Sequence, residues 1–288
     1  MNCSGAGTGR PGCDRSRLSD PRSPGSPDVS VCIITWNARE RLRECLEAVP
    51  AACGGLSFEV VLVDNASADG SGDMVRESFP EVRLVSNPVN RGVARARNQA
   101  LSAAVGEVLV LLDDDTVPRP GSLAFLAGAL RGRARAGIAG PRLESPNGEL
   151  QFSCRRSHNG LTPLLRRLSF LGFVGRSRML RRYLLADWDH SERREVDHVI
   201  GACQAFTREA YARLGPLDER MFYGWEDTDY CVRARRAGLA VLYVPEAIVV
   251  HAERRLTRSR PLSRNTLEFV KSMLIFFWKY PAGIFGRY

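Results

Sequence analysis

Apolar segments of strand length alternate with segments of helical periodicity through the first part of the chain. The strand candidates, rich in β-branched and aliphatic residues, are 29–35, 58–63, 82–86 and 108–112. The helix candidates between them are 38–52, 69–79 and 93–105. Such alternation is typical of parallel βαβ units, in which helices cover both faces of a buried sheet. We therefore predict an α/β fold with a mostly parallel sheet.

Three of these strand candidates end in a polar cluster. The clusters are Thr35-Trp36-Asn37, Asp64-Asn65 and Asp113-Asp114-Asp115. In parallel sheets the carboxyl ends of the strands meet at one edge, and ligands bind there. The polar clusters therefore predict a functional site at this edge.

Of the three clusters, the aspartate triplet indicates the most specific chemistry. Adjacent carboxylates repel one another unless a cation neutralises them, and alternate residues of an extended chain point the same way. Asp113 and Asp115 are therefore predicted to face one site, and oxygen ligands suit Mg²⁺ or Mn²⁺ that holds a diphosphate. The alternative is a solvated acidic turn or a helix cap.

Composition narrows the classes of protein. The chain has 41 basic and 32 acidic residues, a net charge of +9, which suits phosphate, nucleic acid or an anionic membrane surface. The cysteines form no CxxC pair, so we expect no disulfide framework, no structural zinc and a reducing cytosol. The start of the chain has no apolar signal segment, and the apolar run 273–278 is too short to cross a bilayer. We expect a cytoplasmic protein, either soluble or peripheral at a membrane.

Six segments, in order, carry a resemblance to a known family: CIITWN, VVLVDNAS, NRGVARARN, VLLDDDT, GACQAFTREAY and GWEDTDYCVRARRAG. With them the chain resembles a family 2 glycosyltransferase of GT-A fold, in particular the bacterial rhamnosyltransferase-like branch that builds cell-wall and surface polysaccharides. The resemblance spans residues 29–255. It implies a Rossmann-like sheet, a nucleoside-diphosphate sugar donor, and Mn²⁺ or Mg²⁺ as cofactor.

The resemblance also implies the residues on the nucleotide side. Thr35, Trp36 and Asn37 would hold the base and ribose, and Asp64, with Asn65, would accept from the ring N–H that uracil and thymine both present. Asn90, Gly92 and Arg97 would hold the diphosphate, with Asp113 and Asp114 beside them. Glycine permits close backbone approach, and a helix N-terminus and an arginine both favour an anion. The alternatives are an ordinary Asn-Arg-Gly turn and a surface position for Arg97.

On the acceptor side, the resemblance places the catalytic base at Asp227, while Glu226 would orient the acceptor or a loop. The alternative is that both are helix N-terminal carboxylates that complement the helix dipole. His251 would join Asp113 and Asp115 as a metal ligand, and imidazole is an acceptable ligand for Mn²⁺; the alternative is a packed histidine. His158, His190 and His198 receive no role.

The domain organisation follows from the same reading. Residues 1–28, rich in glycine and proline, are predicted to be a disordered leader, and 29–255 the catalytic domain. Residues 155–195, rich in arginine and aromatic residues, are predicted to be a variable insert on the acceptor side. Residues 256–288 hold an amphipathic C-terminal helix, which either packs on the domain or lies at an anionic membrane surface.

We expect an inverting, metal-dependent transferase that moves rhamnose from dTDP-rhamnose to a lipid-linked or polysaccharide acceptor, on the inner face of the plasma membrane if it is peripheral. A UDP-sugar donor, for galactofuranosyl or glucosyl transfer, is the alternative. A sugar-phosphate nucleotidyltransferase would show a glycine-rich arginine loop after the first strand, where this chain has TWNARE. Nucleic acid is not expected as a partner, because no binding module is present and the site is acidic. The sequence leaves the oligomeric state open.

Overall fold

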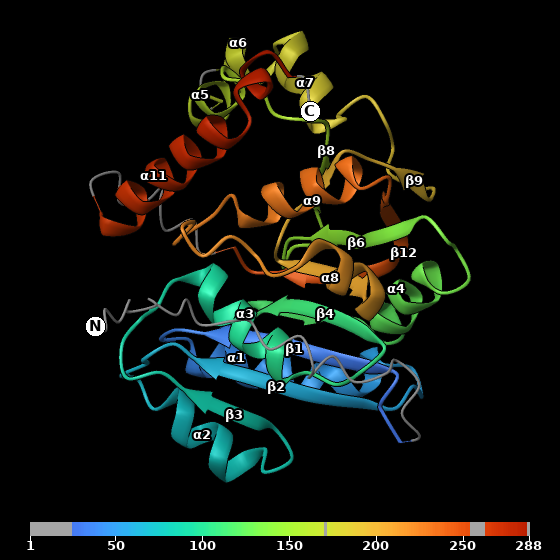
Figure 1. The fold of residues 1–288 in the computed structure, drawn as a ribbon, viewed down its shortest axis with the longest axis vertical. Coiled ribbons are helices and arrows are strands. Elements are labelled where there is room, and N and C mark those ends of the chain that lie inside the picture. Colours follow the sequence, from blue (N-terminus) through green and yellow to red (C-terminus); the bar gives the residue numbers. More distant parts are fainter. Residues whose placement is uncertain (1–24, 170–171, 254–262, 287–288) are drawn as a thin grey trace, which may run out of the picture.

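A computed structural model of the chain describes residues 25–169, 172–253 and 263–286. Most of the predicted leader, and residues 256–262 of the C-terminal extension, lie outside the described residues. Figure 1 shows one large sheet with helices around it, and α5–α7 and α11 at the end opposite β3 and α2.

The N-terminal half is a parallel sheet in the order β3-β2-β1-β4. Its strands are β1 (Val29–Thr35), β2 (Phe58–Asp64), β3 (Arg83–Ser86) and β4 (Val108–Asp113). The connecting helices are α1 (Arg39–Ala52), α2 (Ser71–Ser78) and α3 (Val93–Ala103). The α/β class and the parallel strands predicted for this half are confirmed.

Antiparallel pairs extend the sheet in the C-terminal half. The added strands are β5 (Thr116–Pro118), β6 (Ala136–Glu144), β7 (Leu150–Gln151), β9 (Arg194–Glu195), β11 (Cys203–Thr207) and β12 (Ala240–His251). β11 is antiparallel to β4 and β6, whereas β12 is parallel to β6. Residues 196–206 do not form one continuous strand, because β10 (His198–Val199) and β11 are separate and β10 pairs with β8 (Cys154–Arg155) in a second small sheet.

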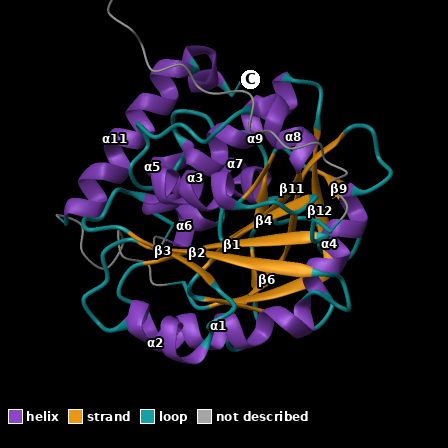
Figure 2. Cartoon of the chain, turned by 60° about the horizontal axis from the view of Figure 1, so that its bottom comes forward, coloured by secondary structure: helices purple, strands orange, loops and turns teal. Residues whose placement is uncertain are grey.

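Side chains of the central strands alternate between two cores, one on each face of the sheet. In β1, Val31 and Ile33 face the core under α1, α2 and α4 (Ser122–Leu130), whereas Cys32 faces the core under α3 and α9 (Glu226–Arg236). This period of two is what a strand buried on both faces requires. Figure 2 shows helices on both sides of the strands. The six cysteines within the described residues are buried and unpaired.

The segment 155–195 is more regular than its sequence indicates. It contains α5 (Thr162–Arg167), α6 (Gly172–Gly175) and α7 (Arg178–Leu184). Two local signals explain the helix starts: Pro163 lies in the first turn of α5, and the Ser177 hydroxyl accepts from the N–H of Leu180 as a cap on α7. These helices are shorter than eight residues, so periodicity could not reveal them.

The C-terminal helix α11 (Arg264–Lys279) packs on the catalytic domain through one of its faces. Phe276 is fully buried against Trp225, which directly precedes α9. The Tyr280 hydroxyl donates to the buried Asp229 of α9 at 2.7 Å, and Lys279 Nζ lies 2.7 Å from the same carboxylate. Of the two alternatives for this helix, packing on the domain is therefore correct for this face.

Two short elements complete the fold. After α11, η2 (Pro281–Phe285) is a short 3₁₀ turn, and α8 (Arg208–Leu214) connects β11 to the loop before α9.

Among the described residues, no helix is both long enough and apolar enough to cross a membrane.

Candidate functional site

The carboxyl ends of β1, β2 and β4 lie side by side. In the parallel register, Thr35 is opposite Asp64, and Ile34 is opposite Asp113. The polar clusters that follow these strands therefore meet at one edge of the sheet, as predicted.

Each aspartate of the triplet has a different partner. Asp113 Oδ1 accepts from Arg97 at 2.6 Å. Asp114 Oδ2 accepts from the Thr35 hydroxyl at 2.8 Å and from the backbone N–H of Trp36 at 3.2 Å, so it holds the end of β1 in place. Asp115 Oδ1 lies 3.5 Å from His251 Nε2. That Asp113 and Asp115 face one ion together stays a prediction: Asp115 lies beside His251, whereas Asp113 is paired with Arg97.

Asp115 and His251 form the better part of the predicted metal site. Gln151 Oε1 lies 2.9 Å from His251 Nδ1, and Gln151 Nε2 donates to the backbone oxygen of His251 at 2.8 Å. With Nδ1 protonated toward Gln151, the lone pair on Nε2 points to the side of Asp115, and burial lowers the pKa of His251. A neutral imidazole beside a carboxylate suits Mn²⁺. Within the described ranges, no three His, Cys, Asp or Glu side chains lie close enough to hold an ion by themselves.

Two protein side chains, Asp115 and His251, could therefore hold a divalent cation. The remaining ligands of the cation would come from a diphosphate or water. Magnesium and manganese sites that share their ligands with phosphates commonly have few protein ligands. Gln151 was missed by the sequence analysis, and no motif signals it, because its contact with His251 spans 100 positions.

The turns after β1 and β2 are tied to each other. Asn37 adopts a left-handed backbone with φ of 52°, and its side-chain oxygen accepts from the N–H of Ala68 at 2.8 Å. Its own N–H donates to Ser67 Oγ at 2.9 Å, and Asp64 Oδ1 accepts from the N–H of Ser67 at 2.9 Å. Beside these turns, Trp36 keeps a partly exposed ring. The two turns predicted to hold the base and ribose are thus held together by hydrogen bonds.

Asn65 connects the end of β2 to the loop before α3. Its amide nitrogen donates to Asn90 Oδ1 at 3.1 Å and to the backbone oxygen of Gly92 at 3.3 Å. Gly92 has a φ of +84°, and a Cβ there would lie 2.6 Å from the ring of Phe222. The backbone oxygen of Phe222 also accepts from the N–H of Val93 at 2.7 Å. From the sequence, the close backbone approach at Gly92 is assigned to a phosphate. In this structure Gly92 packs closely against Phe222, in the loop that leads to α9.

Arg97 lies in the centre of the site rather than on its surface. Its guanidinium is almost fully buried and donates to Glu226 at 3.0 Å, to Asp113 at 2.6 Å and to the backbone oxygen of Gly201 at 2.7 Å. A Cβ on Gly201 would lie 2.6 Å from this guanidinium and 3.1 Å from Asp227. The surface alternative for Arg97 is therefore wrong, and the phosphate contact stays a prediction.

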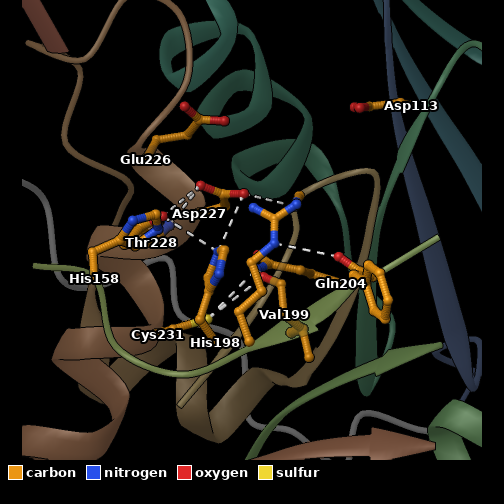
Figure 3. A network of polar contacts seen from close by, with 12 residues as sticks. Asp113, His158, His198, Val199, Gln204, Glu226, Asp227, Thr228 and Cys231 are labelled. Carbon is orange, nitrogen blue, oxygen red and sulfur yellow. Dashed lines mark hydrogen bonds and ion pairs between the residues drawn. The ribbon is translucent and has the colours of Figure 1, made fainter. Parts of the chain in front are cut away.

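Asp227 sits in the first turn of α9 and faces His198. Its Oδ2 accepts from the N–H of Gly201 at 2.8 Å and lies 3.5 Å from His198 Nε2, while Oδ1 accepts from the N–H of Thr228 at 2.6 Å. Figure 3 shows Asp227 turned toward His198 and Thr228, with the Glu226 carboxylate pointing away from them. His198 received no role from the sequence, because only folding brings it within reach of α9.

The pKa values of the two neighbouring carboxylates of α9 are shifted in opposite directions. Burial raises the pKa of Glu226 from its ordinary value of 4.5 to about 7, although Arg97 acts in the opposite direction. Burial also raises the pKa of Asp227, but hydrogen bonds from His198 and Gly201 and the charge of Arg97 outweigh it and bring that pKa below its ordinary value. Pairs of acids whose pKa values are driven apart are typical of sites that transfer protons.

Comparison with known proteins shows the family of the chain. Residues 30–215 match the family described as Glycosyl transferase family 2. The chain belongs to this family. The activity expected from the resemblance is confirmed at the level of the family.

The relatives of this glycosyltransferase include a rhamnosyltransferase. An N-acetylglucosaminyl-diphospho-decaprenol L-rhamnosyltransferase from Mycobacterium tuberculosis is 29% identical over 275 residues, which cover 88% of this chain and 87% of the relative. Among solved structures, GalNAc-T7 with UDP, GalNAc and Mn²⁺ has a TM-score of 0.64 at 19% identity and covers 91% of this chain and 52% of that one. A mannosyltransferase from Pyrobaculum calidifontis with GDP-Man and Mn²⁺ has a TM-score of 0.55 at 22% identity and covers 93% and 76%. These likenesses confirm the predicted GT-A-type fold.

Proposed function

We propose that this glycosyltransferase is an inverting, metal-dependent enzyme that transfers rhamnose from dTDP-rhamnose to a lipid-diphosphate-linked acceptor. The observation that carries the proposal is the pairing of Asp113 and Glu226 through one buried guanidinium, that of Arg97. This pairing fixes the start of α9, and with it Asp227, beside the edge where the sheet ends. A direct displacement at a sugar carbon needs the base to be held at a fixed position relative to the bound donor, and this pairing would hold Asp227 so.

In the proposed reaction, the acceptor hydroxyl oxygen attacks the anomeric carbon of the donor. The new glycosidic bond forms while the bond to the diphosphate oxygen breaks, and that electron pair leaves with the nucleoside diphosphate. The hydroxyl proton passes to the carboxylate of Asp227. A single displacement of this kind inverts the configuration of the anomeric carbon.

Asp227 suits the role of base better than Glu226. Its side chain keeps 17% of its surface exposed, whereas Glu226 keeps 5% and is paired with Arg97. The contacts to His198, Gly201 and Thr228 orient the Asp227 carboxylate. Glu226 holds Arg97 and positions the first turn of α9.

The donor would lie along the sheet edge. Trp36 and the turns at Asn37 and Asp64 would hold the nucleoside, with Asn65, Asn90 and Gly92 shaping the adjoining loop. Asp115 and His251 would hold Mn²⁺ or Mg²⁺ on the other side of the triplet, with Asp113 near Arg97. When bound, the cation would neutralise the charge that develops on the leaving diphosphate.

The acceptor and donor classes come from the relative named above. Its name specifies an N-acetylglucosaminyl-diphospho-decaprenol acceptor and an L-rhamnosyl group, and the two chains cover most of each other's length. We therefore propose a lipid-diphosphate acceptor, cell-wall or surface glycan as product and a cytoplasmic location at the membrane. A UDP-sugar donor for galactofuranosyl or glucosyl transfer is the second candidate, because Asp64 would accept from uracil and thymine alike.

A thermal-shift panel of dTDP, UDP and GDP, each with Mn²⁺, tests the donor class. A ligand that binds only the folded state raises the melting temperature, so dTDP is expected to give the largest rise. Product analysis with dTDP-rhamnose and a short-chain lipid diphosphate then tests transfer. A larger shift with UDP, together with turnover of UDP-sugars only, would replace rhamnose by the second candidate.

A further inference from the structure

The outward face of α11 is as apolar as the face that packs on the domain. Leu267, Val270, Leu274 and Trp278 recur every three or four residues on this side and are exposed, Trp278 by 76% of its surface. A helix that packs through one face is expected to be polar on the other. The packing around Phe276 therefore does not account for this second stripe.

Other exposed apolar side chains belong to the elements next to the end of α11. They are Leu161, Leu164, Phe173, Ile284 and Phe285. The backbone N–H of Gly160 donates to the oxygen of Ile284 at 3.0 Å, so η2 lies directly against the turn that starts α5. Figure 1 shows α5, α6 and α7 gathered around the end of α11. Exposed apolar side chains that gather on neighbouring elements are typical of a contact site.

The charge around these apolar residues is mostly positive, although Glu268 pairs with Lys271 and Asp187 pairs with Arg181. Residues 155–186 contain eight arginines and no aspartate or glutamate. Exposed among them are Arg156, Arg167, Arg176, Arg178, Arg181 and Arg182. On α11 itself, Arg264 and Lys271 border the apolar stripe. Exposed aromatic and aliphatic residues flanked by cations are typical of helices that lie in the interface of an anionic bilayer.

We propose that α11, η2 and α5–α7 form a docking surface for an anionic lipid bilayer. The choice of a bilayer over another partner rests on this charge pattern and on the proposed lipid-linked acceptor. Leu267, Leu274 and Trp278 enter the headgroup region, and the arginines of 155–186 contact lipid phosphates.

The packed face of the same helix contacts the catalytic loop. Trp225, which holds a left-handed backbone with φ of 73°, packs on Phe276 and is followed directly by Glu226 and Asp227. The bilayer and the proposed base would thus lie on opposite sides of one helix. Docking would hold the first turn of α9 at a fixed height above the lipid headgroups, where the diphosphate of a lipid-linked acceptor is found.

Vesicle sedimentation of the full-length protein tests the docking surface. The probes are phosphatidylcholine vesicles with and without phosphatidylglycerol. We expect the protein to bind the phosphatidylglycerol vesicles more tightly, and Leu274→Glu/Trp278→Glu to weaken that binding by at least about tenfold, since each apolar side chain loses its burial. Arg167→Glu/Arg178→Glu should weaken it at low salt, where the charge term is largest.

Phe125→Glu is the matched control, because Phe125 is an exposed aromatic residue on α4 outside this surface. It should bind vesicles as the unaltered protein does. Each variant must keep the thermal shift with nucleotide, which shows that it is folded and separates a failure of docking from a failure of the proposed function. Absence of vesicle binding, or equal binding by Leu274→Glu/Trp278→Glu, would overturn the proposal. A dimer that this variant splits, without vesicle binding, would assign the face to a second copy and overturn it as well.

Discussion

Arg97 donates to Glu226 at 3.0 Å, although 129 positions separate the two residues in the chain. Both side chains are almost fully buried. The same guanidinium contacts Asp113 at the end of β4, so one positive charge connects the parallel half of the sheet to the first turn of α9. Arg97 therefore contributes both to the geometry of the site and to the stability of the fold.

Replacing Arg97 with methionine should destabilise the protein by about 3–5 kcal/mol, because two buried carboxylates lose their partner. Urea unfolding measures the change. Arg95→Met is the control: it lies on the same helix, its side chain is half exposed, and it should change stability by less than about 0.5 kcal/mol. Equal effects of the two substitutions would contradict the structural importance of the buried guanidinium.

Asp227→Asn should lower kcat by about 10²–10⁴-fold, since the amide cannot take the acceptor proton. The thermal shift with nucleotide and Mn²⁺ should remain. Asp187→Asn, an exposed carboxylate that pairs with Arg181, should leave kcat unchanged. A kcat for Asp227→Asn close to that of the unaltered enzyme would remove Asp227 as the base and direct attention to Glu226.

The free energy of unfolding should depend on pH through the titration of Glu226. Its pKa in the folded state is about 7, above the ordinary 4.5, so the folded protein binds the extra proton between these values. Its contribution to stability is therefore complete below pH 4.5 and is lost as the pH rises through 7. Urea unfolding across this range should show a steeper fall for the unaltered protein than for Glu226→Gln. Parallel curves for the two proteins would show that Glu226 titrates normally.

Gln151→Leu should weaken Mn²⁺ binding in the presence of nucleoside diphosphate by about 10–100-fold, because His251 loses the partner that fixes its tautomer and orientation. Electron paramagnetic resonance of free Mn²⁺ measures this without any turnover. Gln151→Glu keeps an oxygen opposite Nδ1 and should retain most of the affinity. If the leucine variant binds Mn²⁺ as tightly as the unaltered protein, His251 is not a ligand held by Gln151.

Phe276→Ala should destabilise the protein by about 3–5 kcal/mol, since it empties the contact between α11 and Trp225. Leu274→Ala, two residues away on the exposed face, should have little effect on urea unfolding. A small effect of Phe276→Ala would mean that α11 is not firmly packed on the domain.

The parallel half of the fold could be predicted because its signals are local. β1 and β4 are continuous apolar runs, and each is followed by a polar turn or an acidic cluster. β6 was missed because its sequence, AGIAGPRLE, contains residues that weaken strands. Gly140 is there for a tertiary reason: a Cβ would lie 2.6 Å from Val199. α4 was missed because SLAFLAGAL is apolar on all sides and shows no helical stripe.

The site could be located from the sequence, but its pairings could not. The polar ends of parallel strands determine where the site lies, and the acidic residues 113–115 and 226–227 indicate its chemistry. Other contacts of the site join distant segments: Gln151 contacts His251 across 100 positions, and His198 contacts Thr228 across 30 positions. Such contacts depend on the register of antiparallel strands and on the break between β10 and β11, which a periodic pattern does not encode.

The long separation between Asp113 and Glu226 also orders events during synthesis. Translation proceeds from the N-terminus, so the strands β1–β4 leave the ribosome while α9 has still to be made. At that stage Arg97 can pair with Asp113 alone. The acids of α9 are made more than a hundred residues later, so a nascent chain that contains only β1–β4 lacks the proposed base. In the proposed mechanism, the nucleoside-binding turns after β1 and β2 are thus synthesised first, the base of α9 next and the metal ligand His251 last.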